Sequence, residues 1–134
     1  MRIAKKIREI APRKGKVIVS GGRGIGGAAF FGTLEELAKL LGGELASSRA
    51  GVAAGWIPYP YQVGSTGRRV SPDLYIACGI SGTPQHRLGI KDAAHIIAIN
   101  SYTNAPIFEI AEFGVVGDLR LVVPALIRHL HEAK

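Results

Sequence analysis

The chain has 134 residues, 47% of them apolar and 7% aromatic, which is enough for one domain with a mostly aliphatic core. No apolar run reaches the ~20 residues of a membrane-spanning helix, and the basic N-terminus lacks the apolar stretch of a signal peptide. The lone cysteine, Cys78, excludes an internal disulfide framework. We therefore expect a cytoplasmic protein with no membrane insertion.

The net charge of +7 is distributed unevenly along the chain. Residues 1–16 hold seven Lys or Arg and one acid, Glu9, whereas the rest of the chain holds ten basic and nine acidic groups. The body of the protein is thus nearly neutral and offers no basic face to a nucleic acid. We expect residues 1–15 to be a solvated basic leader and residues 16–134 to form the domain, although such a leader can also contact an acidic partner or nucleic acid.

Short apolar strands alternate with helical segments along the chain. Strands are expected at residues 16–20, 44–47, 74–78, 96–99 and 107–110, with a short edge strand at 115–116. Helical segments are expected at residues 2–10, 33–41, 49–54, 85–88 and 118–132. This alternation predicts an α/β fold with a mainly parallel sheet covered on both faces.

Three local patterns set element boundaries. Ile3, Ile7 and Ile10 form an i, i+4, i+7 seam, which predicts that residues 2–10 are an amphipathic helix. The capping-box sequence Thr33-Leu34-Glu35-Glu36 predicts that the next helix begins at Thr33. Pro124 is expected to kink or restart the last helix.

A glycine-rich segment, Gly22-Arg23-Gly24-Ile25-Gly26-Gly27, follows the first strand and matches the G-x-G-x-x-G pattern of classical Rossmann domains. The expected helix does not begin at the third glycine, and the second strand ends in Ser47-Ser48-Arg49, without an acid for a ribose. Arg23 is better interpreted as a charge directed at a phosphate or at a partner.

Two further loops, residues 62–67 and 79–86, flank a single predicted strand and combine glycines with hydroxyls, an amide and an imidazole. Thr66 and Ser81 supply hydroxyls, and His86 can donate a hydrogen bond to a carbonyl or oxyanion. Such loops suit a large polar ligand, although a surface position explains a lone histidine equally simply.

Polar residues also stand where other strands end. Ser48 is placed to cap a short helix, so that Arg49 can point into the crevice at the carboxyl ends of the strands. A plain cap with a surface arginine is the alternative. Asn100 ends a strand and Asp118 starts the last helix, the positions that a nucleoside-binding pair would take, although Asp118 also suits a helix start.

The whole pattern resembles the C-terminal FAD-binding domain of the electron transfer flavoprotein alpha subunit, from Lys16 to about Leu130. The matching motifs are Val19-Ser20-Gly21-Gly22-Arg23-Gly24, Ala46-Ser47-Ser48-Arg49-Ala50, Gln62-Val63-Gly64-x-Thr66-Gly67, Gly79-Ile80-Ser81-Gly82-x-x-Gln85-His86, Ala98-Ile99-Asn100, Ala105-Pro106-Ile107-Phe108 and Phe113-Gly114-x-Val116-x-Asp118-Leu119. The resemblance implies a three-layer sandwich of the non-classical, DHS-like NAD/FAD-binding type.

The resemblance also implies roles for individual residues. Arg49 would lie near the isoalloxazine, Thr66 near flavin N5 and His86 beside the O2 carbonyl, while Asn100 and Asp118 would serve the adenosine end. The implied cofactor-binding set is Arg23, Ser48, Arg49, Gln62, Val63, Gly64, Ser65, Thr66, Ser81, Gly82, Thr83, Pro84, Gln85, His86, Asn100, Asp118 and Leu119.

In this interpretation the chain is an electron carrier for a flavin dehydrogenase rather than an enzyme with its own substrate. Its expected partners are a beta-type subunit, or a second copy of itself, and the dehydrogenase. The sequence departs from the family at Ser65, where the family usually has Gln, and at Ala53, where it often has Asp. Only residues 1–15 precede the match, so we expect a stand-alone, split or excised domain.

Two other functions stay open at this point. The glycines at 22–27 could serve a Rossmann-type NAD(P)-binding oxidoreductase, or the domain could be a non-redox module that binds an adenine nucleotide for assembly or regulation. No metal site is expected, because His129 and His131 diverge on the predicted last helix.

Overall fold

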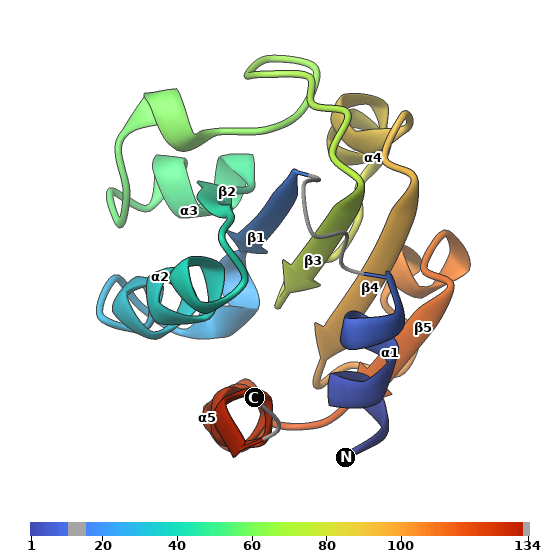
Figure 1. Cartoon of the computed structure of the whole chain (residues 1–134). Coiled ribbons are helices and arrows are strands. Elements are labelled where there is room, and N and C mark those ends of the chain that lie inside the picture. The colour runs from blue at the N-terminus through green and yellow to red at the C-terminus, as the bar shows by residue number, and fades with distance from the viewer. Residues whose placement is uncertain (11–15, 133–134) are drawn as a thin grey trace.

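The computed structural model describes residues 1–10 and 16–132. Its centre is a five-stranded sheet with the order β2-β1-β3-β4-β5, in which every neighbouring pair is parallel (Figure 1). The strands are β1 (Val17–Gly21), β2 (Glu44–Ser47), β3 (Leu74–Cys78), β4 (His95–Asn100) and β5 (Phe113–Val116). This is a doubly wound order with a switch point between β1 and β3, and it differs from the order of the classical Rossmann fold.

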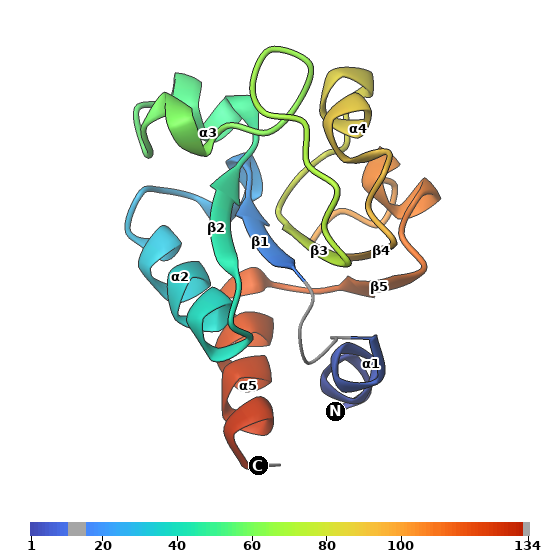
Figure 2. The ribbon, with the colours of Figure 1, turned by 45° about the horizontal axis from the view of Figure 1, so that its top comes forward.

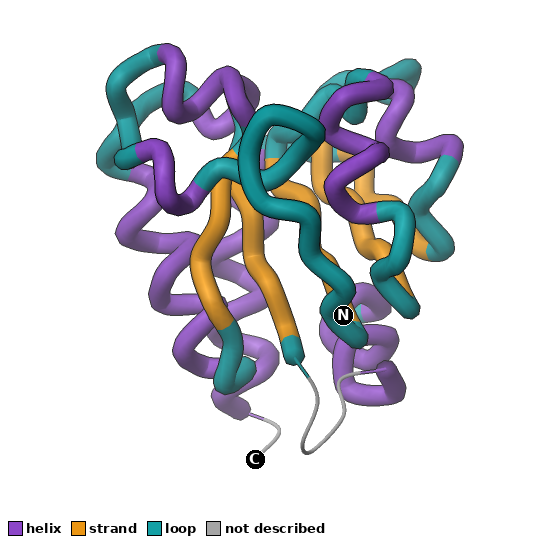
Figure 3. Tube along the Cα trace, turned by 90° about the horizontal axis from the view of Figure 1, so that it is seen from above, coloured by secondary structure: helices purple, strands orange, loops and turns teal. Residues whose placement is uncertain are grey.

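Helices cover both faces of the sheet, as expected for buried parallel strands. The helices are α1 (Arg2–Ile10), α2 (Phe30–Leu40), α3 (Arg49–Ala53), α4 (Pro84–Ile90) and α5 (Leu119–Glu132), with 3-10 turns η1 (Arg23–Ile25), η2 (Tyr59–Tyr61) and η3 (Pro106–Glu109). Figure 1 shows α2 and α5 below the sheet, α4 above it, and α3 beside the edge strand β2. In Figure 2 α2 and α5 lie side by side, and in Figure 3 the strands form one layer between helices and loops.

Two apolar clusters fill the space on either side of the sheet. On one face α1, α2 and α5 pack against alternate strand residues such as Val19 and Ile76. On the other face Ile90 of α4 and Ile107 of η3 pack with Tyr75. The α/β fold with a parallel sheet and three layers is thereby confirmed. Among the described helices, none is long and apolar enough to cross a membrane.

Most of the expected elements are present, but the strand predicted at 107–110 is wrong. Residues Pro106–Glu109 form η3 instead, with proline at its first position, and the backbone N–H of Ile107 donates to the Ser81 carbonyl at 2.8 Å. The backbone of this short apolar run thus makes its hydrogen bonds in a turn beside the 79–86 loop. The place at the sheet edge is taken by β5, close to the strand predicted at 115–116.

The start and interior of two helices also differ from expectation. α2 begins at Phe30, so Thr33 lies inside the helix and the predicted capping box does not cap it. An earlier start brings the side chain of Phe31 into the core, together with that of Leu34. Pro124 does not restart α5, which runs through it from Leu119 to Glu132.

The N-terminal segment is not the solvated leader that its charge suggests. Ile3 and Ile7 of α1 are buried in the core, and α1 contacts α5. The Arg8 guanidinium donates to the carbonyls of His129 and Leu130 at 3.0 and 2.9 Å, where it satisfies the last turn of α5. The expectation of solvation is therefore wrong for α1, because its apolar seam outweighs its charge. Residues 11–15 of the expected leader lie outside the described residues.

Candidate functional site

A cavity of about 790 Å³ lies beyond the carboxyl ends of β1, β2, β3 and β4. Its wall comes from the segment after each strand, represented by Arg23 after β1, Arg49 after β2, Ser81 after β3 and Tyr102 after β4. The loop at 62–67 and the start of α4 complete it. This is the crevice at the topological switch point where open α/β sheets bind their ligands.

The glycines after β1 bring two loops together below this cavity. The Gly24 N–H donates to the Gly79 carbonyl at 2.9 Å, and a Cβ on Gly24 would stand 2.8 Å from the Gly79 Cα. Gly79 itself has a φ of 66°, which favours glycine. The G-x-G-x-x-G match therefore serves loop packing: η1 begins directly after the first glycine of the motif, Gly22, and α2 does not begin until Phe30.

The loop at 62–67 is held against its neighbours by its backbone. The Val63 N–H donates to the Ser47 carbonyl at 2.9 Å, and the Ser65 N–H donates to the Gln85 carbonyl at 3.0 Å. Gly64, with a φ of 140°, lies directly against Gly89 of α4. These contacts place the Ser65 and Thr66 side chains at the wall of the cavity.

The structure brings most of the residues predicted from the sequence into this one wall. Those that line the cavity are Arg23, Ser48, Arg49, Val63, Gly64, Ser65, Thr66, Ser81, Gly82, Thr83, Gln85, His86 and Asn100. They come together because the carboxyl ends of parallel strands meet at one edge of the sheet.

The remaining four predicted residues lie outside the lining. Gln62 is buried and donates from Nε2 to Thr66 Oγ1 at 2.9 Å, so it supports a lining residue. Pro84 occupies the first position of α4. Asp118 is exposed and accepts the Arg120 N–H at 2.9 Å at the start of α5. Leu119 is buried in the apolar core.

Ser48 stands at the start of α3 as predicted, but its hydroxyl does not cap the helix. Ser47 Oγ donates to the Ser48 carbonyl at 2.8 Å, and the Ser48 N–H donates to the Gly21 carbonyl at 3.0 Å. The Ser48 hydroxyl is thus available to a ligand at the cavity wall.

The charge of the lining has one sign. Arg23 and Arg49 are exposed, and no Asp or Glu is among the described residues that line the cavity. Two cations without a counter-ion favour an anionic ligand, phosphate groups above all.

His86 is a buried titratable group in the wall of the cavity. It is 5% exposed, its Nε2 lies 2.7 Å from the Tyr75 hydroxyl, and its Nδ1 has no hydrogen-bond partner among the described residues. Burial lowers the pKa of His86 to about 4, and the Val63 backbone opposes that shift only in part. At neutral pH His86 is therefore an uncharged imidazole that can donate one hydrogen bond.

The sequence-based prediction missed part of the wall. Tyr102, 61% exposed, lines the cavity beside Ser101, and Ala105 and Pro106 follow. These residues could have been identified from the sequence because they follow Asn100, a predicted site residue that ends β4. An exposed aromatic ring at a cavity wall can stack on a planar ligand ring.

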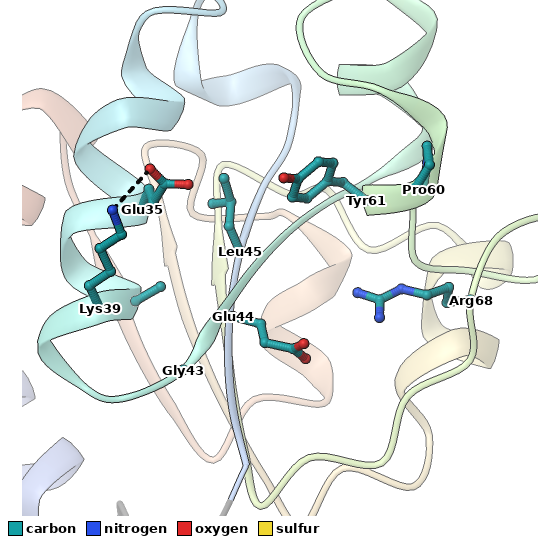
Figure 4. Close-up of a pocket in the computed structure, with 9 residues that line it drawn as sticks. Glu35, Lys39, Gly43, Glu44, Leu45, Pro60, Tyr61 and Arg68 are labelled. Carbon is teal, nitrogen blue, oxygen red and sulfur yellow. Dashed lines mark ion pairs between the residues drawn. The ribbon is translucent and has the colours of Figure 1, made fainter.

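A second hollow, of about 440 Å³, lies beside the outer strand β2 (Figure 4). It is lined by charges of both signs, including the Glu35–Lys39 ion pair at 3.6 Å, Glu44 and Arg68. Because its lining residues all fall outside the predicted set and its charges are mixed, the cavity at the strand ends is the better candidate.

Fold and cavity together define a doubly wound, parallel α/β domain with a cationic ligand cavity at its switch point. The profile of the family described as "Electron transfer flavoprotein FAD-binding domain" matches residues 13–91, and the chain belongs to this family.

Curated relatives agree with this assignment. The chain is 50% identical over 133 residues to "Electron transfer flavoprotein subunit alpha" of Thermoanaerobacterium thermosaccharolyticum, covering 98% of this chain and 40% of that protein. "Protein FixB" of Clostridium saccharobutylicum is 54% identical over 117 residues, covering 87% and 35%. The mitochondrial alpha subunit of Arabidopsis thaliana is 46% identical over 119 residues, covering 89% and 33%. The chain thus spans 33–40% of the length of these relatives.

Proposed function

We propose that the chain binds FAD in the cavity at the strand ends and serves as the cofactor-holding part of an electron carrier. The observation that carries this proposal is the lining itself, which combines two arginines that have no ion-pair partner among the described residues with a buried imidazole. Membership of a family described as FAD-binding supports it.

The residues present fit this cofactor on three counts. The volume of about 790 Å³ lies within the roughly 300–1,000 Å³ usual for cofactor sites. Arg23 offers a positive charge to a phosphate group, and Arg49 offers one to the ring that gains negative charge on reduction. Tyr102, 61% exposed at the cavity wall, matches a planar ring on which it can stack.

Bound FAD would supply the electron-transfer chemistry, and the residues of this chain would bind and orient it. Arg49, Thr66 and His86 would hold the ring end, where a cation and a donor favour the negative charge that reduction places on the ring. Residues 81–86 would contact the central phosphates, and the segment after β4 would hold the adenosine end, with Tyr102 beside it.

Partners and reaction follow from the relatives as part of the same proposal. Proteins named alpha subunits imply a second subunit, and we propose that a beta-type subunit, or a second copy of this chain, covers the cavity. A flavin dehydrogenase would be the electron donor. We place the protein in the cytoplasm.

The test is reconstitution of purified protein with FAD, followed by absorbance spectroscopy and titration. We expect a flavin spectrum shifted from that of free FAD. Arg49→Ala should weaken FAD binding about tenfold through loss of one charge-assisted contact, while the matched control Arg128→Ala, an exposed residue of α5, should not. If the protein bound no FAD on reconstitution and stayed colourless, the proposal would be overturned.

The same titration separates the two other functions. Preference for NADP would favour an oxidoreductase, and AMP binding without FAD binding would favour an adenine-nucleotide module.

A further inference from the structure

The guanidinium of Arg87 joins two loops that form one side of the cavity. Its Nε donates to the Gly82 carbonyl at 2.9 Å, and its Nη2 donates to the Pro106 carbonyl at 2.8 Å. Nη2 also pairs with Glu109 Oε1 at 3.0 Å. Gly82 and Pro106 line the cavity, whereas Arg87 is not among the lining residues. Arg87 therefore holds two residues of the wall without forming part of the wall.

The two loops follow different strands of the sheet. Gly82 lies between β3 and α4, and Pro106 begins η3 in the segment between β4 and β5. In Figure 2 the orange turn of η3 lies beside the yellow α4, which carries Arg87. Both loops begin where their strands have ended, so the sheet hydrogen bonds do not fix the distance between them. That distance depends on contacts between the loops themselves.

The donors of Arg87 match their acceptors one for one. Nε carries one hydrogen and Nη2 carries two, and the acceptors are two backbone carbonyls and the Glu109 carboxylate. Because the guanidinium is planar and rigid, it holds these acceptors in fixed relative positions, which a lysine ammonium would not do. The side chains of Arg87 and Glu109 are 31% and 69% exposed, so their ion pair contributes little. The two carbonyl bonds carry the effect.

The loops approach each other closely at the same place. The Ile107 N–H donates to the Ser81 carbonyl at 2.8 Å. Gly82 has a φ of 85°, and a Cβ there would stand 2.6 Å from the Ile107 nitrogen. If the loops moved apart, the bond from Ile107 to Ser81 would break first, and this side of the cavity would widen.

We infer that Arg87 is a positioning residue that fixes the spacing of Gly82 and Pro106 before a ligand enters the cavity. A wall that is ordered in advance binds its ligand more tightly, because binding does not then cost the entropy of ordering the loops. The identity of the ligand rests on the proposed function, whereas the spacing of the loops does not.

The first experiment needs no cofactor. Amide hydrogen exchange of ¹⁵N-labelled, FAD-free protein, followed by NMR, reports opening of the bond from Ile107 to Ser81. In Arg87→Met, which keeps an apolar stem and loses the guanidinium, we expect the Ile107 N–H to exchange about tenfold faster. Exchange at Val19 in β1 should change less. Arg128→Met, the same substitution at an exposed residue of α5, should leave exchange at both sites unchanged.

Two further variants separate the carbonyl bonds from the ion pair. Glu109→Gln keeps an oxygen acceptor and both carbonyl bonds, so its effect on exchange at Ile107 should be smaller than that of Arg87→Met. Arg87→Lys keeps the charge but loses the planar set of donors, so it should resemble Arg87→Met. If exchange at Ile107 were unchanged in Arg87→Met, or rose only as much as exchange at Val19, the inference would be overturned.

The second experiment measures FAD binding by titration. Arg87→Met should bind FAD about tenfold more weakly, because only the fraction of molecules with an ordered wall binds. Ile7→Ala is the control for a general loss of stability, since Ile7 packs in the apolar cluster on the other face of the sheet from α4. While folded, it should bind FAD as the wild type does.

The outcomes distinguish this inference from the proposed function. If the wild type and Arg87→Met bound FAD equally well, the inference would be overturned and the proposed function would stand. If neither protein bound FAD while exchange at Ile107 still depended on Arg87, the inference would be supported and the proposed function refuted.

Discussion

Asn100 Nδ2 donates a hydrogen bond to the Ile80 carbonyl at 3.0 Å and so joins the segments after β4 and β3. Its Oδ1 accepts the Tyr102 N–H at 2.9 Å. The side chain predicted from the sequence as an adenosine ligand thus shapes two loops of the wall. Its first role is to hold the Ile80 and Tyr102 backbones in place beside the cavity.

Replacement of Asn100 tests this role. Asn100→Ala removes the partner of a buried carbonyl, so we expect the free energy of unfolding to fall by about 1–3 kcal/mol. Urea denaturation of FAD-free protein measures the change. Asn104→Ala, an exposed residue of the same loop, should stay within about 0.5 kcal/mol of wild type. Equal stabilities for the two variants would show that the amide serves only a ligand.

The contact between Gly89 and Gly64 makes a separate prediction. A Cβ on Gly89 would stand 2.5 Å from the N and Cα of Gly64, so Gly89→Ala must displace the 62–67 loop. We expect the free energy of unfolding to fall by about 1–3 kcal/mol and FAD binding to weaken. Denaturation measures the first change and FAD titration the second.

The matched control is a helical glycine with open space around its Cα. Gly32→Ala, on the exposed side of α2, should raise the free energy of unfolding by about 0.5–1 kcal/mol through higher helix propensity. If both variants gained stability, the close approach of α4 to the loop would be disproved.

The buried imidazole of His86 predicts a pH dependence of stability. Because its pKa is lowered from 6.5 to about 4 in the folded state, the unfolded chain binds more protons between these values. The full contribution is present above pH 6.5 and is lost as the pH falls toward 4. The loss amounts to about 3 kcal/mol at most.

Denaturation at a series of pH values measures this effect. His86→Gln should flatten the curve between pH 6.5 and 4, while His131→Gln, an exposed residue near the end of α5, should leave it unchanged. A curve for His86→Gln that is parallel to wild type would mean that His86 is charged in the folded state.

The packing of α1 predicts that the N-terminal helix contributes to stability. Ile7 is 0% exposed, so Ile7→Ala should lower the free energy of unfolding by about 2–5 kcal/mol. Leu121→Ala, 72% exposed on α5, should cost less than about 0.5 kcal/mol. Thermal or urea unfolding measures both. If Ile7→Ala left the free energy of unfolding unchanged, the N-terminal segment would be solvated, as its charge suggests.

The strands were predictable because parallel strands buried on both faces are continuous apolar runs, as in Leu74–Cys78. The errors arose where a local pattern competed with packing. The run at 107–110 became a 3-10 turn, and Thr33 lost its capping role because Phe31 belongs to the core. The charge of residues 2–10 predicted that this segment is solvated, but its isoleucine residues pack one face of the helix into the core.

The sequence by itself determined the fold class, the family and most of the cavity wall, because residues at the ends of parallel strands must meet at one edge. The tertiary structure alone decided which neighbours each of these residues has. Tyr75 lies behind His86, Gly89 lies against Gly64 and Asn100 holds Ile80, and each pair joins segments at least 11 residues apart. Such pairs depend on how helices and loops pack on the sheet, a property that no local motif encodes.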